Sequence, residues 1–196
     1  MGGDGMRSDT KNPSRGLAIA LIAAIAIGLG FLGDFVITGL EKQAYPRNYS
    51  EYVTVYAEKY GIPENLVYSV IRTESDFESG AVSRVGAIGL MQIMPDTFKW
   101  LTDDILFEHM EVGMLYDPET NIRYGTFYLS YLYDRYADWD LVIAAYNGGL
   151  GNVDKWLEDE SYADGEGGLK KIPFRETRQF SRRVNRAWDK YDKLYS

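Results

Sequence analysis

The amino-acid sequence predicts a mostly α-helical globular domain preceded by one apolar helix near the N-terminus. Apolar residues recur at intervals of three and four along most of the chain, which is the spacing of one helix face. No stretch of useful length alternates apolar and polar residues, as strands with one solvated face would. Hydrophobic residues make up 45% of the 196 residues, which is enough for a packed core.

The N-terminal region predicts a membrane anchor. Residues 16–33 carry no charge, and the apolar run resumes after Asp34. A membrane-spanning helix needs about 20 apolar residues, and the basic residues before the run place the N-terminus in the cytoplasm. A cleaved signal peptide is the alternative, but the small-x-small triplets that cleavage needs lie inside the run or contain a lysine. The expected segments are a cytoplasmic tail at 1–16, a transmembrane signal-anchor at 17–40, a stalk at 41–49 and a domain at 50–196.

Start and stop signals define the helices of the domain. Ser50 is placed to cap the first helix, and Gly61 is placed to end it. Pro63 suits the first turn of the second helix, and Asp117 and Asp138 suit the starts of two later ones. Loop signals fill the stretch after the second helix. The expected helices lie at about 50–61, 63–74, 95–101, 117–136, 138–149, 153–157 and 175–194.

Composition excludes several classes of function. The net charge is −8, which argues against binding nucleic acid through phosphate contacts. The absence of cysteine excludes disulfides and thiolate nucleophiles, and a single histidine, His109, excludes a zinc site built on two histidines. We therefore expect no metal and no cofactor, and chemistry that uses carboxylates, hydroxyls and amides.

Glu74 is the first candidate for that chemistry. It follows Leu66 and Val70 at intervals of four, which puts it on the apolar face of its helix. Burial disfavours an ionised carboxylate and raises its pKa, as a general acid near neutral pH requires. Spacing alone leaves a second interpretation open, in which Glu74 turns to solvent at a frayed helix end.

Two further stretches combine glycines with polar side chains. GAVSRVGAIGLMQIMP, from residue 80, contains Ser83 and places Gln92 in an apolar run, where it needs core partners or faces a polar ligand. AAYNGG, from residue 144, puts Tyr146 and Asn147 in the last turn of an apolar helix, where a C-cap explains only the glycines. A tight turn and a helix end are the purely structural alternatives.

Together these stretches resemble a known enzyme family. ESDFESGAVSRVGAIGLMQIMPDT, AYNGG and IPFRETRQF, in this order and at these separations, are similar to motifs of the soluble lytic transglycosylase (SLT) catalytic domain. The resemblance covers about residues 47–195. It implies a lysozyme-like fold of the goose-type/SLT kind. It also implies cleavage of the MurNAc-β-1,4-GlcNAc bond of peptidoglycan without water, which leaves 1,6-anhydro-MurNAc ends.

The resemblance assigns roles to individual residues. It makes Glu74 the catalytic acid and base, and it makes Glu176 a substrate contact near the cleft. The family usually has a tyrosine where this chain has Phe180, so one hydroxyl is missing there. The residues that the resemblance places along the glycan cleft are Ser83, Met91, Gln92, Tyr146 and Asn147.

One carboxylate suffices for this reaction. Most glycosidases need a second acid at a set separation, and neither Asp76 nor Glu78 is well placed to serve as one. We expect protonated Glu74 to protonate the leaving oxygen while the N-acetyl group of the substrate stabilises the cation. The ionised carboxylate then takes the proton of the C6 hydroxyl, which attacks the anomeric carbon. Tyr146 would support these charge changes if it lies nearby.

Two other functions remain open at this stage. A lysozyme-type muramidase would hydrolyse the same bond, but it would need a second carboxylate to position water. A non-catalytic peptidoglycan-binding component of an envelope-spanning machine would have machinery proteins as partners, although the intact set of motif residues argues against lost activity. The expected partners are otherwise glycan strands and, through the anchor, the cell membrane, with the domain on the extracytoplasmic side.

Overall fold

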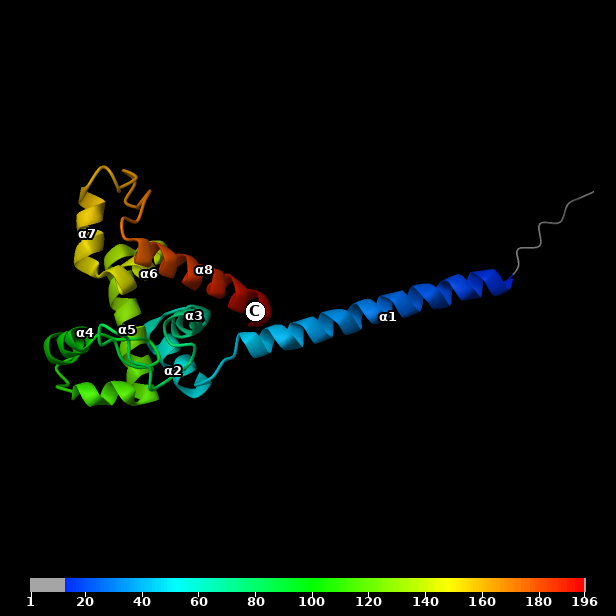
Figure 1. Cartoon of the computed structure of the whole chain (residues 1–196), viewed down its shortest axis with the longest axis horizontal. Coiled ribbons are helices and arrows are strands. Elements are labelled where there is room, and N and C mark those ends of the chain that lie inside the picture. The colour runs from blue at the N-terminus through cyan, green and yellow to red at the C-terminus, as the bar shows by residue number, and fades with distance from the viewer. Residues whose placement is uncertain (1–12, 196) are drawn as a thin grey trace, which may run out of the picture. The chain divides into compact units, whose positions relative to one another are not determined.

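The computed structural model describes residues 13–195 of the chain, with side chains from residue 17 onward. Within this range the chain forms helices, connecting loops and isolated β-bridges, and no strand (Figure 1). It divides into two compact units, with the boundary between Ala44 and Tyr45. The helices are α1 (Pro13–Ala44), α2 (Ser50–Tyr60), α3 (Glu64–Glu74), α4 (Pro95–Lys99), the π-helix η1 (Trp100–Ile105), the 3-10 helix η2 (Val112–Tyr116), α5 (Pro118–Tyr136), α6 (Trp139–Gly148), α7 (Leu150–Glu158) and α8 (Arg175–Tyr195).

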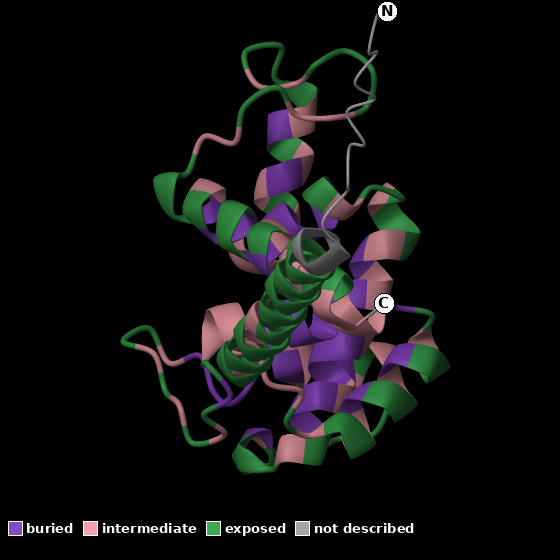
Figure 2. Ribbon diagram, turned by 90° about the vertical axis from the view of Figure 1, so that its right-hand side faces the viewer, coloured by how far each residue is buried: buried purple, intermediate pink, exposed green. Residues whose placement is uncertain are grey.

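α1 is the apolar helix that the sequence predicts. Leu17–Ala44 reaches a mean hydropathy of 2.3 and is long enough to cross a membrane. Its large apolar residues are exposed, and Figure 2 colours most of the helix as exposed. The helix covers the span expected at 17–40 and continues through four residues of the expected stalk.

Most helix boundaries follow the local signals. Asp117 and Asp138 begin α5 and α6, and each accepts a hydrogen bond from the backbone N–H three residues on, at 2.8 and 2.9 Å. Gly61 ends α2 in the left-handed region, at φ 67°. The cap expected at Ser50 is wrong, because Ser50 is already the first helical residue and a cap needs a non-helical backbone. Tyr49 stands before it at φ 62°, without a side-chain cap.

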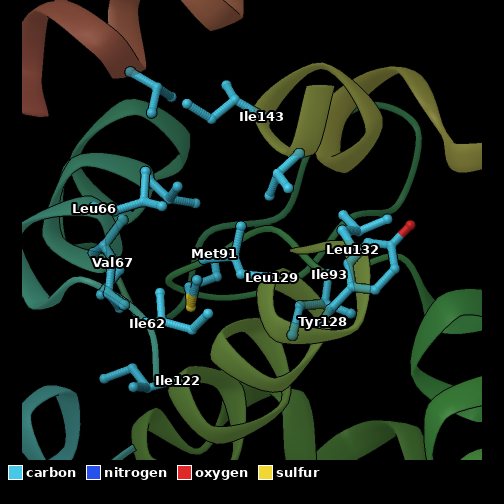
Figure 3. Packing of buried hydrophobic residues seen from close by; sticks show 14 of the residues in the cluster. Ile62, Leu66, Val67, Met91, Ile93, Ile122, Tyr128, Leu129, Leu132 and Ile143 are labelled. Carbon is cyan, nitrogen blue, oxygen red and sulfur yellow. The ribbon is translucent and has the colours of Figure 1, made fainter. Parts of the chain in front are cut away.

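The core lies where α3, α5, α6 and α8 meet. α3 packs against α8, α2 packs against α5, and α6 packs against both α5 and α8. Side chains of the segment that follows α3 enter the same core, so this loop is part of the packing rather than a surface excursion. Figure 3 labels Ile62, Leu66, Val67, Met91, Ile93, Ile122, Tyr128, Leu129, Leu132 and Ile143 in this cluster.

Residues 45–49 belong to the folded domain, whereas the sequence predicts a stalk there. The hydroxyls of Tyr191 and Tyr195, near the end of α8, donate hydrogen bonds to the backbone carbonyls of Pro46 and Tyr45 at 2.8 and 2.7 Å. The ring of Tyr45 also meets that of Tyr191 edge-on, with centroids 5.5 Å apart. These contacts join residues about 145 positions apart, so no local pattern reveals them.

Arg47 completes this contact. Its guanidinium lies 5.0 Å from the ring centroid of Tyr68 and 4.7 Å from that of Tyr195. It also donates a hydrogen bond to Oδ1 of Asn65 at 2.8 Å. We call the set of Tyr45, Arg47, Tyr68, Tyr191 and Tyr195 the N-terminal clasp, because it holds the start of the domain to its last helix.

Replacing Arg47 should destabilise the domain. Arg47→Ala removes two cation–π contacts, a hydrogen bond and a partly exposed ion pair with Glu64 at 3.6 Å, and we expect it to lower the free energy of unfolding by about 1–2.5 kcal/mol. Urea unfolding of the detergent-solubilised chain, followed by tryptophan fluorescence, measures this loss. Arg84→Ala is the control, because Arg84 is exposed and pairs with no residue that the structure describes. Equal losses in the two variants would show that the clasp contributes nothing.

Candidate active site

Glu74 is the last residue of α3, and its side chain is half-buried. Removal from water raises the pKa of its carboxyl group to about 8. The positive charge of Arg183 acts in the opposite direction, and the negative charge of Glu176 adds to the rise. Glu74 is therefore mostly protonated at neutral pH, as the apolar spacing predicts. The alternative of a solvated side chain at a frayed helix end is wrong.

The segment after α3 folds back on the end of that helix. The hydroxyl of Ser75 donates a hydrogen bond to the carbonyl of Leu90 at 2.8 Å. Ile88 and Ile93 exchange backbone hydrogen bonds, both at 3.0 Å, which closes the tip of the loop. The loop is thereby fixed beside Glu74 by its own backbone hydrogen bonds and by the hydroxyl of Ser75, which directly follows Glu74.

Asn121 of α5 holds this loop from the core side. Its Oδ1 accepts a hydrogen bond from the N–H of Met91 at 2.8 Å, and its Nδ2 donates to the carbonyls of Ile88 at 2.9 Å and Leu115 at 2.8 Å. The side chain is 1% exposed, so these bonds are made without competition from water. Gly89 has φ +79°, and a Cβ there would lie 2.1 Å from Nδ2 of Asn121. Glycine is required at this position both for its backbone angle and for the close approach.

Met91 was expected along the cleft, but its side chain is fully buried. It packs over Gly125, where a Cβ would come within 2.3 Å of the methionine sulfur. The polar part of Met91 that takes part in the site is its backbone carbonyl. That oxygen accepts a hydrogen bond from the hydroxyl of Tyr146 at 2.8 Å.

Tyr146, in the last turn of α6, lies close to Glu74. Burial raises the pKa of its phenol well above the ordinary value, and the charges of Glu74 and Tyr128 add to the rise. The residue therefore acts as a neutral dipole whose proton points at Met91. Its ring stacks on that of Phe180, with centroids 6.5 Å apart and planes 8° from parallel. Phe180 stands where the family usually has a tyrosine, and it is 1% exposed. Because phenylalanine has no hydroxyl, it adds no polar group to the core that would need a hydrogen-bond partner.

Ser83 and Gln92 lie in the same loop, and their hydrogen bonds stay within it. The hydroxyl of Ser83 accepts from the N–H of Ala87 at 2.9 Å. Gln92, at φ 49°, donates from Nε2 to the carbonyls of Ala81 at 3.1 Å and Gly89 at 2.9 Å. Both side chains are half-buried. The amide oxygen of Gln92 is the part of the side chain left to accept a hydrogen bond from a ligand.

The remaining candidates differ in exposure. Asn147 is half-buried beside Tyr146, and Glu176 is exposed near the start of α8. Glu176 is nevertheless close enough for its charge to raise the pKa of Glu74. Across residues 17–195, no group of three or more acidic or histidine side chains is arranged to hold a metal ion.

Sequence reasoning missed three contributors to this site. Ser75 and Asn121 fix the loop, and Arg183 places a positive charge near Glu74. Asn121 gave a weak signal, since it is a polar residue next to Ile122 on the inner side of a predicted helix. Nothing in the sequence indicates which basic residue of α8 faces Glu74, because that depends on how the helix is rotated against α3.

A family model described as "Transglycosylase SLT domain" matches residues 51–167. The chain belongs to the transglycosylase SLT domain family. The fold is therefore that of this family, as the resemblance implies.

Named relatives of the SLT domain agree with this assignment. The soluble lytic murein transglycosylase of Escherichia coli (strain K12) is 34% identical over 157 residues, which are 79% of this chain and 24% of that protein. Membrane-bound lytic murein transglycosylase C of Edwardsiella ictaluri is 38% identical over 135 residues, which are 58% of this chain and 34% of that protein. The chain thus spans about a quarter of the length of the soluble relative and a third of the membrane-bound one.

Solved structures resemble the SLT domain closely. The 70 kDa soluble lytic transglycosylase Slt70 from Escherichia coli gives a TM-score of 0.71 at 33% identity, covering 79% of this chain and 25% of that one. An inactive glutamate-to-glutamine mutant of lytic transglycosylase Slt from Pseudomonas aeruginosa gives a TM-score of 0.68 at 32% identity, covering 78% of this chain and 25% of that one.

Gly89→Ala should destabilise the domain much more than Gly86→Ala. Both glycines have a positive φ, but an added Cβ meets Asn121 only at Gly89 and meets nothing within 4 Å at Gly86. We expect a loss of about 1 kcal/mol from backbone strain at Gly86 and more than about 3 kcal/mol at Gly89. Urea unfolding measures both values. Similar losses would mean that the Asn121 contacts yield easily and do not fix the loop.

Glu74→Gln should change how stability depends on pH. A carboxyl group with a pKa near 8 in the folded state and near 4.5 in the unfolded state binds more protons when folded. The stability of the natural protein therefore falls as pH rises between these values, and glutamine removes this loss. We expect the variant to gain stability relative to the natural protein from pH 4.5 to pH 8, as measured by urea unfolding. Parallel pH profiles would show that Glu74 is well solvated.

Proposed function

We propose that this SLT domain is a peptidoglycan lytic transglycosylase that cleaves MurNAc-β-1,4-GlcNAc bonds and forms 1,6-anhydro-MurNAc ends. The observation that carries the proposal is a carboxyl group, Glu74, whose pKa is raised to about 8 within an SLT domain. Relatives named as lytic murein transglycosylases support it. The solved relative that is inactive after one glutamate-to-glutamine change supports an essential role for one glutamate.

In this mechanism Glu74 acts twice. Its protonated form gives a proton to the glycosidic oxygen as the bond from that oxygen to the anomeric carbon breaks. The substrate N-acetyl group stabilises the cation, and the ionised carboxylate then takes the proton of the C6 hydroxyl as that oxygen attacks the anomeric carbon. No water is consumed, and Glu74 ends the cycle protonated. Arg183, whose charge opposes the rise in pKa, stabilises the ionised form between the two steps.

The other site residues would hold the glycan. Tyr146 fixes the Met91 carbonyl and presents a neutral phenol beside Glu74. The amide oxygen of Gln92 and the side chains of Ser83 and Asn147 would bind sugar hydroxyl and acetamido groups. Glu176, which is exposed, would contact the substrate at the edge of the site.

Hydrolysis is the second candidate, and one observation favours it. Glu176 supplies a second carboxylate whose charge reaches Glu74, whereas no second acid is evident from the sequence alone. A muramidase would use such a group to position water. The exposure of Glu176 makes the one-carboxylate reaction the better supported of the two.

We also propose that α1 anchors the domain to the cell membrane, with the domain on the extracytoplasmic side. The length and hydropathy of Leu17–Ala44 support a membrane span. The named relative that is membrane-bound supports a membrane location for a domain of this kind. Basic residues before the apolar run favour a cytoplasmic N-terminus.

Glu74→Gln should reduce the release of anhydro-muropeptides from purified sacculi by about a thousandfold, since a positioned acid typically contributes 10²–10⁴. Liquid chromatography with mass spectrometry measures the products. Glu78→Gln is the matched control, because Glu78 is exposed in the adjacent loop.

Activity of the natural enzyme should also decline above about pH 8, where Glu74 loses its proton.

Two results would contradict these proposals separately. Undiminished activity of Glu74→Gln would remove Glu74 from the reaction. Products heavier by one water than the anhydro form would show hydrolysis and would favour the muramidase.

A further inference from the structure

Positive charge is concentrated at the C-terminal end of this acidic chain. Residues 168–196 contain nine Lys and Arg against three Asp and Glu, a net charge of +6. Residues 1–167 contain 12 Lys and Arg against 26 Asp and Glu, a net charge of −14. The C-terminal segment thus has the opposite sign to the rest of the chain.

Much of this charge lines one groove along α8. The groove has a volume of about 680 Å³ and runs between α8 and the segment 169–172. Arg178 and Lys170 also line it, but both have structural partners: Arg178 donates to the carbonyls that precede α8, and Lys170 donates to the carbonyl of Glu160. The groove has three other cations, Lys171, Arg182 and Arg186. Their side chains form no ion pair or hydrogen bond with any residue between 13 and 195.

The groove also contains an unsatisfied hydroxyl. Ser181 is 7% exposed, and its Oγ has no hydrogen-bond partner in the described chain. Buried polar atoms nearly always have a partner, and a rotation of the Ser181 side chain would be needed for this oxygen to find one in a ligand. Three cations and one hydroxyl are suited to an anionic oxygen such as that of a phosphate. Asp189 is the acidic residue on the lining, and it leaves the groove strongly positive.

The N-terminal clasp relates this groove to the membrane through chain connectivity. Tyr195, at the end of α8, is bonded to Tyr45, which directly follows the last residue of α1. The apolar run ends at Leu40, so at most about 18 Å of chain separates it from the clasp. Arg186 lies nine positions before Tyr195 along α8, a rise of about 14 Å. Arg186 is thus separated from the end of the apolar run by at most about 32 Å along this path.

We propose that the groove formed by Lys171, Ser181, Arg182 and Arg186 binds the phosphate groups of anionic phospholipids. This inference rests on the proposed anchoring by α1, and it is independent of the catalytic mechanism. Basic residues near an anionic bilayer are attracted to it, whereas the rest of this acidic domain is repelled. Docking through the groove would hold the domain by one side of α8.

The experiment uses the full chain reconstituted in nanodiscs. Since the chain has no cysteine, Asp189→Cys gives a single labelling position on the groove for a fluorophore. A nitroxide on a small fraction of the lipid headgroups quenches this fluorophore when the groove meets the bilayer. We expect strong quenching in phosphatidylcholine discs with about 30% phosphatidylglycerol, and weak quenching in pure phosphatidylcholine or at about 0.5 M NaCl.

The decisive variant is Arg182→Gln with Arg186→Gln, both at exposed positions. Removing two cations should lower the ratio of docked to undocked domain about thirtyfold. The matched control, Arg84→Gln with Lys155→Gln, removes two exposed cations elsewhere and should keep the quenching. Circular dichroism checks that all variants are folded.

Several outcomes would overturn the proposal. Equal quenching in the two kinds of disc, or equal losses in both double variants, would show that the groove does not recognise anionic lipid. Shielding of the fluorophore by added soluble muropeptides, without dependence on lipid composition, would make the groove a peptide site. Loss of sacculus cleavage by Glu74→Gln is unaffected by any of these results, so failure here is distinguishable from failure of the proposed reaction.

Discussion

The buried amide of Asn121 is the interaction on which the geometry of this site depends. Its three hydrogen bonds join α5 to Ile88, Met91 and Leu115, and losing the bond to Met91 would leave a backbone N–H unpaired in the core. With the loop fixed, the Met91 carbonyl is held where the hydroxyl of Tyr146 can bond to it. The bond from Ser75 to the same loop fixes the end of α3. One side chain on α5 therefore sets the relation between a carboxyl group on α3 and a phenol on α6.

The same packing creates a conflict between stability and reactivity. A half-buried Glu74 is poorly solvated, so its ionised form is costly and its proton is retained at neutral pH. A glutamine of the same size would remove that cost but could not exchange a proton. Arg183 limits the conflict, because its charge favours the ionised form without removing the effect of burial. The site keeps a carboxyl group that is neither permanently charged nor permanently neutral.

Much of the fold was predictable because its signals are local. The caps at Asp117 and Asp138 and the stop at Gly61 depend only on neighbouring residues, and the spacing of Glu74 from Leu66 and Val70 indicated its burial. The predictions that were wrong or incomplete concern residues whose structure depends on segments far away in the sequence.

Residues 45–49 look like a polar linker until the tyrosines of α8 are placed beside them. Ser50 failed as a cap because the backbone at Tyr49 turns one residue earlier. The roles of Asn121 and Arg183 depend on which faces of α5 and α8 turn inward, and helical periodicity gives that only approximately.

The N-terminal clasp also determines how the domain carries mechanical load. Tension arriving along the chain from α1 first reaches Tyr45, whose carbonyl is bonded to the last residue of α8. The force therefore divides between α2 and a 21-residue helix that packs along α3 and α6. Several hydrogen bonds and ring contacts must shear together before α2 can be peeled away. A domain held through α1, as we propose, would gain resistance to unravelling from this arrangement.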